Sequence, residues 1–200
     1  ALADLAPEFE ANHPGIKMSF DASSNTIIWD VTKEGGAEIK NEYIKCALSG
    51  TNLLIKGEPL RITSEAEQDG LTLTSAELII ENDTTICVNN NRNSTTGKSG
   101  ISVNKFNVKE GAALHIHNFQ YGVYLPTNST STVRGLLDVS GTSGAHGINS
   151  GYGNRAIDVG DDNAVYIKEV KKEYSLEYGT DRIEVIGSTK SECWLKLFMD

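Results

Sequence analysis

The fold is decided between Ile86 and Lys168, where the chain repeats the segments Ile86-Cys87-Val88, Leu114-His115-Ile116, Leu137-Asp138-Val139 and Val165-Tyr166-Ile167. The starts of these segments are 28, 23 and 28 residues apart, and a second series beginning at Gly100, Gly122 and Gly147 follows with starts 22 and 25 residues apart. Residues two positions apart in a strand point to the same face, so each segment can direct two aliphatic side chains at a shared interior. Repeats that stack on one another bury such side chains continuously. The sequence therefore predicts a mainly β protein, a single-domain parallel β-solenoid.

The segments on either side of this rhythm predict caps. Residues 1–52 are expected to form an N-terminal cap, in which Ala1–Asn12 has the apolar spacing of a short amphipathic helix and Ile16–Phe20 alternates as a strand. Residues 53–168 are expected to form the solenoid coils. Residues 169–200 are expected to add capping strands, because the last coil would otherwise expose an unpaired edge.

Some segments are less regular. Asn89–Ser99 and Thr127–Val133 are rich in Asn, Ser and Thr with hardly an aliphatic residue to bury, which predicts surface loops. Ala37–Leu48 has a spacing that permits a helix as readily as strands. Asn-x-Thr sequons fall in expected turns, where a eukaryotic secreted protein would carry glycans and a bacterial one would simply have turns. They begin at Asn82, Asn93 and Asn128.

Composition excludes several classes of function. The net charge is -9, from 27 acidic and 18 basic residues, which argues against a nucleic-acid partner because phosphate binding needs a basic surface. No apolar run approaches the roughly 18 to 20 residues that span a bilayer, which argues against membrane insertion. Three widely spaced cysteines exclude a dense disulfide framework and a CxxC metal knuckle. The sequence leaves the oligomeric state open.

The coil rhythm over about residues 53–168 resembles that of right-handed parallel β-helix proteins of bacterial cell surfaces, the pectate-lyase-like superfamily with its carbohydrate-binding members. The resemblance implies an extracellular or cell-surface location and a non-catalytic role in binding or adhesion. It also implies a glycan or another cell-surface component as the partner. No cofactor is expected apart from Ca²⁺, which is discussed below.

A second resemblance concerns residues 2–24. Asp4–Glu10, His13–Lys17 and Phe20–Ser24 resemble the first helix and second strand of ABC-transporter solute-binding proteins of the molybdate-binding type. In that family a serine of the equivalent turn contacts the oxyanion, and this serine would fall on Ser23 or Ser24. The resemblance implies an alternative function as a periplasmic small-solute (oxyanion) binding protein.

Gly160-Asp161-Asp162, followed by Ile167-Lys168, resembles a segment of β-helical polygalacturonases whose paired aspartates act as acid and base. The resemblance implies a second alternative, a polysaccharide lyase or hydrolase using these aspartates or Asp158 with Arg155 or Lys168. His146 precedes the aspartates here, whereas the histidine motif of that family follows them. We therefore favour turn hydrogen bonds for these acids and expect no enzyme. Asp158, Asp161 and Asp162 could alternatively hold Ca²⁺, which prefers oxygen ligands.

His115 and His117 are two residues apart and therefore share a strand face. If coils stack in the proposed register, their neighbours are Cys87 and Asn89 on one side and Asp138 and Ser140 on the other. Two imidazoles beside a carboxylate can bind Zn²⁺ or another transition metal. A solvated polar ladder explains the same residues without any ion, and it is the interpretation favoured by the sequence alone.

Aromatic and amide side chains gather around the same expected turns. Sugar recognition uses aromatic faces for the pyranose ring and amide or carboxylate groups for the hydroxyls. The sequence therefore predicts a glycan site with Tyr121 as its best platform, while Phe119 and Tyr124 are also suited to filling the core. The predicted ligand-binding residues are Phe119, Tyr121, Tyr124, Tyr152, Asn154 and Asp158.

Overall fold

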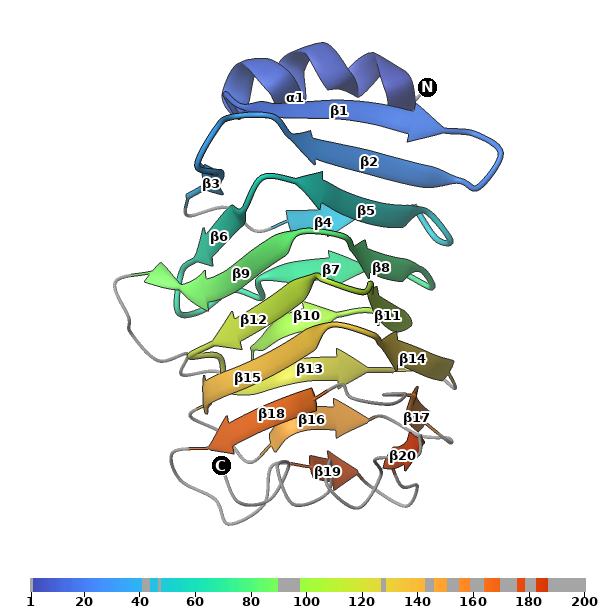
Figure 1. Ribbon diagram of the computed structural model, residues 1–200, viewed down its shortest axis with the longest axis vertical. Coiled ribbons are helices and arrows are strands. Elements are labelled where there is room, and N and C mark those ends of the chain that lie inside the picture. The colour runs from blue at the N-terminus through green and yellow to red at the C-terminus, as the bar shows by residue number, and fades with distance from the viewer. Residues whose placement is uncertain are drawn as a thin grey trace.

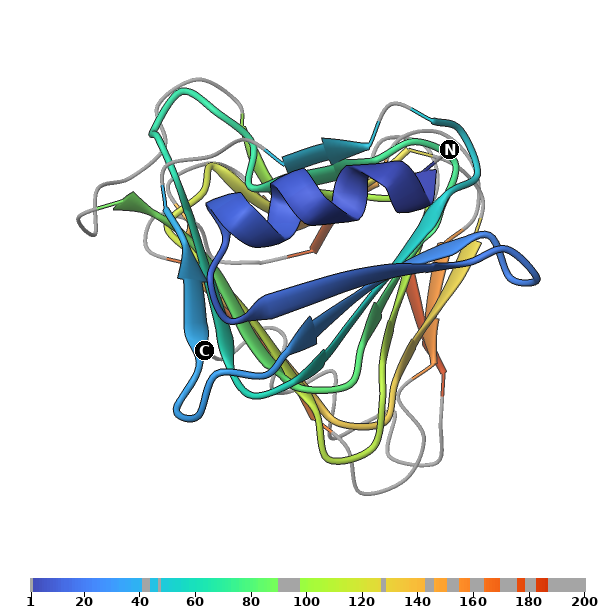
Figure 2. The same cartoon turned by 90° about the horizontal axis from the view of Figure 1, so that it is seen from above.

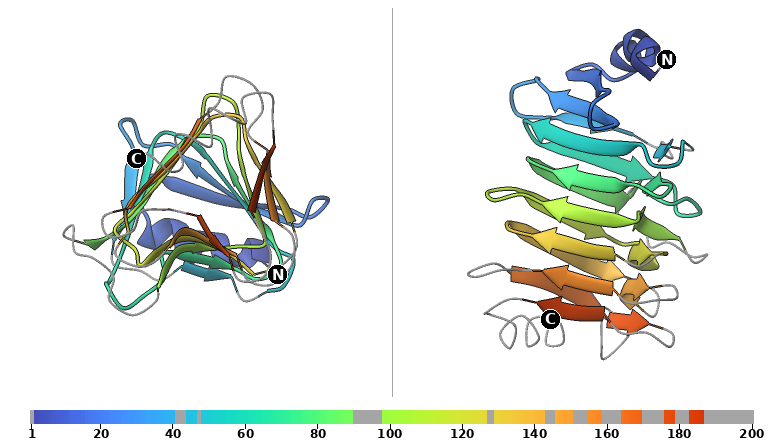
Figure 3. Two further views of the ribbon diagram at one scale, coloured as in Figure 1. Left: turned by 90° about the horizontal axis from the view of Figure 1, so that it is seen from below. Right: turned by 90° about the vertical axis from the view of Figure 1, so that its right-hand side faces the viewer.

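The computed structural model describes residues 2–40, 44–46, 48–89, 98–126, 129–142, 146–150, 155–158, 164–169, 176–178 and 183–186. Over these residues the chain forms a parallel β-solenoid, as the sequence predicts, in which three sheets enclose a triangular interior (Figures 1 and 3). Each turn of the chain contributes one strand to each sheet. We call the three sheets A, B and C.

Sheet A has the order β1 (Ile16–Asp21), β2 (Thr26–Val31), β5 (Asn52–Gly57), β8 (Glu77–Ile80), β11 (Lys105–Val108), β14 (Ser129–Val133), β17 (Arg155–Asp158) and β20 (Ile183–Ile186). Sheet B has the order β18 (Ala164–Glu169), β15 (Leu136–Thr142), β12 (Ala113–His117), β9 (Asp83–Val88), β6 (Leu60–Ser64) and β3 (Ala37–Ile39). Sheet C has the order β19 (Leu176–Tyr178), β16 (His146–Ser150), β13 (Tyr121–Leu125), β10 (Ser99–Ser102), β7 (Leu71–Leu73) and β4 (Ile44–Cys46). Neighbouring strands pair in parallel, except that β1 and β2 form an antiparallel hairpin.

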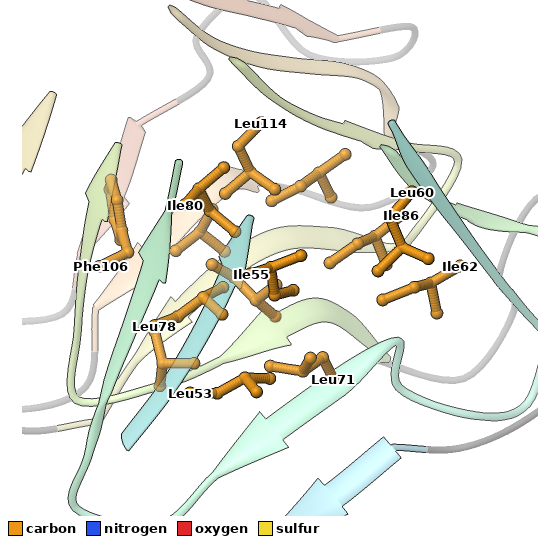
Figure 4. Close-up of a cluster of buried hydrophobic side chains, with 14 of the residues drawn as sticks. Leu53, Ile55, Leu60, Ile62, Leu71, Leu78, Ile80, Ile86, Phe106 and Leu114 are labelled. Carbon is orange, nitrogen blue, oxygen red and sulfur yellow. The ribbon is translucent and has the colours of Figure 1, made fainter. Parts of the chain in front are cut away.

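The interior is filled by columns of aliphatic side chains that stack from coil to coil (Figure 4). In sheet B one column runs through Ile62, Ile86, Ile116 and Val139, all fully buried and in register. Each side chain in the column loses contact with water because its neighbours above and below cover it. Burial of one such side chain stabilises the fold by about 1.5 to 3 kcal/mol.

One register differs from the expected alignment of the repeats. Ile86 lies opposite Ile116, and Leu114 lies opposite Thr84, so β9 is displaced by two residues from the predicted pairing. The inward position that we expected to be aliphatic is therefore held by a threonine. Thr84 is fully buried, and its hydroxyl donates to Asn82 Oδ1 at 2.6 Å, which satisfies the polar group inside the core.

The prediction of a loop at Thr127–Val133 is wrong, because β14 occupies Ser129–Val133. Ser131 is fully buried there, and its Oγ accepts a hydrogen bond from the backbone N–H of Phe106 at 3.1 Å. A serine whose hydroxyl forms a hydrogen bond with the neighbouring coil can thus occupy an inward position. The prediction from the sequence had expected only aliphatic residues at such positions. In the other expected loop, Ser99 already belongs to β10, and residues 90–97 lie outside the described part of the chain.

The parallel stacking extends beyond residues 53–168 on both sides. At the N-terminal side β2 pairs in parallel with β5, and Ala37–Leu48, which the sequence left undecided, contains the strands β3 and β4. At the other side β19 and β20 continue sheets C and A in parallel. Among the sequons, Asn82 is buried and its Nδ2 donates to the Glu58 carbonyl at 2.9 Å, so it is not an exposed glycan acceptor.

The N-terminal helix is confirmed, as a short 3-10 turn at Leu2–Leu5 followed by α1 (Ala6–Asn12). Together with β1 it lies across the open end of the triangle (Figure 2). Phe9 of α1 stacks on Trp29 of β2 with ring centroids 5.0 Å apart, so the helix covers apolar side chains of the first coil. None of the helices in the described residues has the length and hydropathy needed to cross a membrane.

Leu114→Ala is expected to lower the free energy of unfolding by about 2 to 5 kcal/mol, because it leaves a cavity at a fully buried position between two coils. Urea denaturation of the two proteins measures the difference. Leu5→Ala is the matched control, because Leu5 is 53% exposed and its truncation should change stability by no more than about 0.5 kcal/mol. Equal effects of the two substitutions would contradict the arrangement of the core.

Candidate functional site

Polar side chains form an outward column on sheet B. In register from coil to coil, the column consists of Glu38, Arg61, Thr85, His115 and Asp138. These residues face outward because each precedes an inward aliphatic residue in its strand, and side chains alternate between the two faces. The repeat that builds the core therefore also stacks functional groups about one strand spacing apart, roughly 4.8 Å, on the outside.

Three of these outward groups converge at β12 and β15, and we call His115, His117 and Asp138 the imidazole–carboxylate cluster. Nδ1 of His115 donates to Oδ2 of Asp138 at 2.8 Å, and Nε2 of His117 donates to the same oxygen at 2.9 Å. The two rings meet edge to face with centroids 5.9 Å apart. On the opposite side, Nε2 of His115 lies 3.4 Å from Oδ1 of Asp83 in β9. His115 is thus held between carboxylates of the two neighbouring coils.

The cluster shifts the pKa values of His115 and Asp138. The hydrogen bond with Asp138 raises the pKa of His115, against an opposing effect of burial, and the charges of Asp138 and Asp83 raise it further. Burial by itself raises the pKa of Asp138, but the hydrogen bonds from His115 and His117 and their charges together outweigh it and hold that pKa well below its usual range. Asp138 is therefore ionised at neutral pH and acts as an acceptor.

A polar pocket of about 210 Å³ lies beside the cluster, at the corner between sheets A and B. Asp83 lines this pocket and also faces His115, so the pocket and the cluster adjoin. The corner is shaped by Gly36, whose φ of +112° suits glycine and where a Cβ would lie 2.6 Å from the Pro59 carbonyl oxygen. The lining residues are Gly35, Gly36, Ala37, Glu38, Pro59, Leu60, Arg61, Asp83 and Thr85.

A second pocket, of about 290 Å³, lies under the N-terminal helix. Its lining includes Phe9, Met18, Trp29 and Leu53 and is apolar except for Lys45, Thr51 and Asn52. It offers few hydrogen-bonding partners to a polar ligand. The polar pocket and the imidazole–carboxylate cluster are therefore the candidate site.

The expected contribution of Phe119 to a glycan site is wrong, because this side chain is fully buried. It fills the corner between sheets B and C, where glycines leave it room, and a Cβ at Gly100 would lie 3.1 Å from its ring. Tyr121 and Tyr124 are half-buried on β13 of sheet C, a different face from the cluster. Tyr152 and Asn154 lie outside the described residues.

Of the residues predicted as metal ligands, the structure brings together His115, His117 and Asp138. His115 faces Asp138 and His117 faces Ser140, as expected, whereas their partners in β9 are Thr85 and Cys87 instead of Cys87 and Asn89. Asp161 and Asp162 lie outside the described residues. Asp158 ends β17 in sheet A, and its side chain lies outside the described part.

The turn between β1 and β2 gives Ser23 and Ser24 a carboxylate as their partner. The hydroxyls of Ser23 and Ser24 donate to the Asp21 carboxylate at 2.7 and 2.8 Å, respectively. These hydrogen bonds, that of Ser23 foremost, lower the pKa of Asp21. A fixed negative charge beside both hydroxyls disfavours an oxyanion at this turn.

Sequence reasoning missed Arg61, Glu38 and Asp83 as members of a site. For Glu38 and Arg61, the sequence did contain a signal. Each directly precedes an aliphatic residue expected to point inward, Ile39 and Ile62 respectively. Asp83 had no such signal, because its approach to His115 depends on the register between β9 and β12, which was expected two residues away.

The chain matches no family model, no curated protein and no solved structure in the comparisons made with each. The solenoid is therefore established by its strand pairing alone. Its function has to be inferred from the chemistry of the sheet B face.

Asp138→Asn is expected to lower the pKa of His115 towards its ordinary value of 6.5, because the substitution removes the strongest acceptor and a nearby negative charge. NMR titration of the His115 ring measures the shift. Asp83→Asn is the control, and it should lower the pKa by less because Asp83 acts only through its charge.

The shifted pKa values of His115 and Asp138 also make the stability of the fold depend on pH. A raised pKa for His115 favours the folded state below about pH 6.5, and this contribution is lost as the pH rises through the folded-state value. A lowered pKa for Asp138 favours folding above about pH 3.8, and this contribution is lost as the pH falls. Unfolding curves of Asp138→Asn should lack the Asp138 contribution and show a smaller His115 contribution, and unchanged curves would contradict the pairing.

Proposed function

We propose that this solenoid is a non-catalytic module that binds glycans at a cell surface or in an extracellular matrix, through the polar pocket of sheet B. The observation that carries the proposal is the combination of one guanidinium, two carboxylates and a hydroxyl around a single pocket of about 210 Å³. These groups come from Arg61, Glu38, Asp83 and Thr85. Sheet B holds them on adjacent coils of a rigid scaffold.

The chemistry of the pocket suits a polyhydroxylated ligand. A sugar hydroxyl both donates and accepts, so it needs acceptors such as Glu38 and Asp83 and a donor such as Arg61. Hydrogen bonds to charged groups are about twice as strong as neutral ones. Two carboxylates against one guanidinium leave the pocket with an excess of negative charge. We therefore expect an uncharged saccharide rather than an acidic one.

The size of the pocket supports recognition of a single sugar unit. Its volume is below the roughly 300 to 1,000 Å³ of sites for drug-sized ligands, so the remainder of a longer glycan would lie along the outer face of sheet B. The strands that carry Arg61, Asp83 and Thr85, β6 and β9, are paired on both edges, and β3, which carries Glu38, is the end strand of sheet B and pairs with β6. Less conformational entropy is then lost on binding.

The carboxyl group of Asp138, beside the pocket, is not in the state that an acid catalyst needs. A glycosidase needs one carboxyl group with a raised pKa to act as the acid. Asp138, which lies beside the pocket, has a lowered pKa instead.

Arg61→Ala is expected to weaken binding of a neutral glycan by tenfold or more, because charge-assisted hydrogen bonds contribute about 1.5 to 3 kcal/mol each. A glycan array identifies the ligand, and calorimetric titration measures the change in affinity. Tyr124→Ala is the matched control, since it removes a half-buried side chain from sheet C and should leave the affinity unchanged.

If Tyr124→Ala lost binding while Arg61→Ala kept its affinity, the polar pocket would not be the glycan site. The site would instead lie on sheet C, at the tyrosines that the sequence predicted. The absence of binding to any neutral glycan on the array by the unmodified protein would contradict the proposed function. Circular dichroism of each variant confirms that the fold is retained before affinities are compared.

A further inference from the structure

We propose that His115, His117 and Asp138 bind a divalent transition-metal ion, with Zn²⁺ as the representative case. This site goes beyond glycan binding and does not depend on it. Among the described residues, these three side chains each offer one ligand atom, and all three atoms lie within 4.8 Å of one another.

The donor atoms already face a common point. Nδ1 of His115 and Nε2 of His117 lie 2.8 and 2.9 Å from the same oxygen of Asp138, which accepts a hydrogen bond from each ring. With metal–ligand bonds of about 2.0 Å, ligand atoms in a tetrahedral site are roughly 3.3 Å apart. Each nitrogen therefore needs to move only about 0.5 Å away from Oδ2 of Asp138. The two nitrogens, which lie within 4.8 Å of each other, need to reach the same spacing through side-chain rotation for an ion to replace the two protons.

A second carboxylate, that of Asp83, lies against the other ring nitrogen of His115. Its other ring nitrogen, Nε2, lies 3.4 Å from Oδ1 of Asp83, so Nδ1 is left to face Asp138 and His117. Metal-bound histidines characteristically donate their second N–H to a carboxylate or carbonyl, which fixes the orientation of the ring. A neutral imidazole has only one N–H to donate, and the structure places a carboxylate against each nitrogen of His115.

The donor set selects the class of ion. Imidazole nitrogen suits Zn²⁺, Cu²⁺ and Ni²⁺, whereas Ca²⁺ takes six to eight oxygen ligands. Two of the three donors here are nitrogens, so this cluster is not a site for the Ca²⁺ that the sequence allowed for the aspartates of residues 158–162. The side chains of His115, His117 and Asp138 are 25%, 33% and 26% exposed, which leaves a fourth coordination position open to water.

The local scaffold is suited to holding the three ligands. His115 and His117 alternate with Leu114 and Ile116, which are both fully buried, so the backbone of β12 cannot rotate without exposing the core. Asp138 is fixed opposite His115 by the parallel pairing of β12 with β15. Ligands on strands of a stacked sheet are positioned more reproducibly than ligands on loops.

The test is a calorimetric titration of the full chain, first freed of metal by a chelator, with ZnCl₂. We expect one ion per chain at the cluster. His117→Asn removes a ligand with little change in size and should abolish this binding, and Asp138→Asn should weaken it strongly. Asp21→Asn is the control, because Asp21 is a carboxylate of the distant β1–β2 turn and its loss should change nothing.

Asp83→Asn distinguishes a built metal site from two adventitious imidazoles. Loss of a partner that orients a metal ligand typically weakens metal affinity by 10- to 100-fold, so this variant should retain one ion per chain with that reduction. An unchanged affinity would show that Asp83 has no such role and would count against the site.

Titration with Co²⁺ identifies the ligands by their spectrum. Nitrogen and oxygen ligands give weak visible bands, while a thiolate adds intense near-ultraviolet absorption. We expect the first pattern, although Cys87 pairs with His117 across the ladder, because the thiol is not among the converging atoms. A thiolate spectrum, undiminished Zn²⁺ binding in His117→Asn, or no binding by the folded parent chain would each overturn the proposal.

Discussion

The stacking of inward side chains across parallel strand pairs is the constraint on which the rest of the structure depends. A coil cannot bury its aliphatic residues by itself, so Ile86, Ile116 and Val139 are covered only because they lie directly above one another. A slip of one residue would turn every inward side chain outward. The register that buries this column therefore also fixes which outward groups become neighbours, and it places His115 beside Asp138.

Polar residues inside the solenoid are tolerated where they pair with a neighbouring coil. The Asn82 side chain donates to the Glu58 carbonyl and accepts from Thr84, and Ser131 accepts from the backbone of Phe106. These hydrogen bonds replace apolar contacts, because a buried polar group destabilises the fold only when it is unpaired.

The two proposed binding sites share a residue, Asp83, whose carboxylate lines the polar pocket and faces Nε2 of His115. The outer face of sheet B therefore carries a column of polar groups from Glu38 through Arg61 and Thr85 to His115 and Asp138. An ion held by the imidazole–carboxylate cluster would add positive charge beside a pocket that has two carboxylates. A glycan in the pocket and an ion at the cluster would thus be neighbours on one face, and each would change the electrostatic environment of the other.

The sequence by itself determined the strands that carry alternating aliphatic residues, their inward aliphatic pairs and the N-terminal helix, because a period of two or of 3.6 residues is local. It also determined that His115 and His117 share a face and that Asp138 is their neighbour, since the segments at Leu114 and Leu137 repeat in register. Only the tertiary structure decided that Phe119 fills the core, that Ser129–Val133 is a strand and that Asp83 approaches His115. These features depend on register and contacts between coils more than 20 residues apart, which no local pattern encodes.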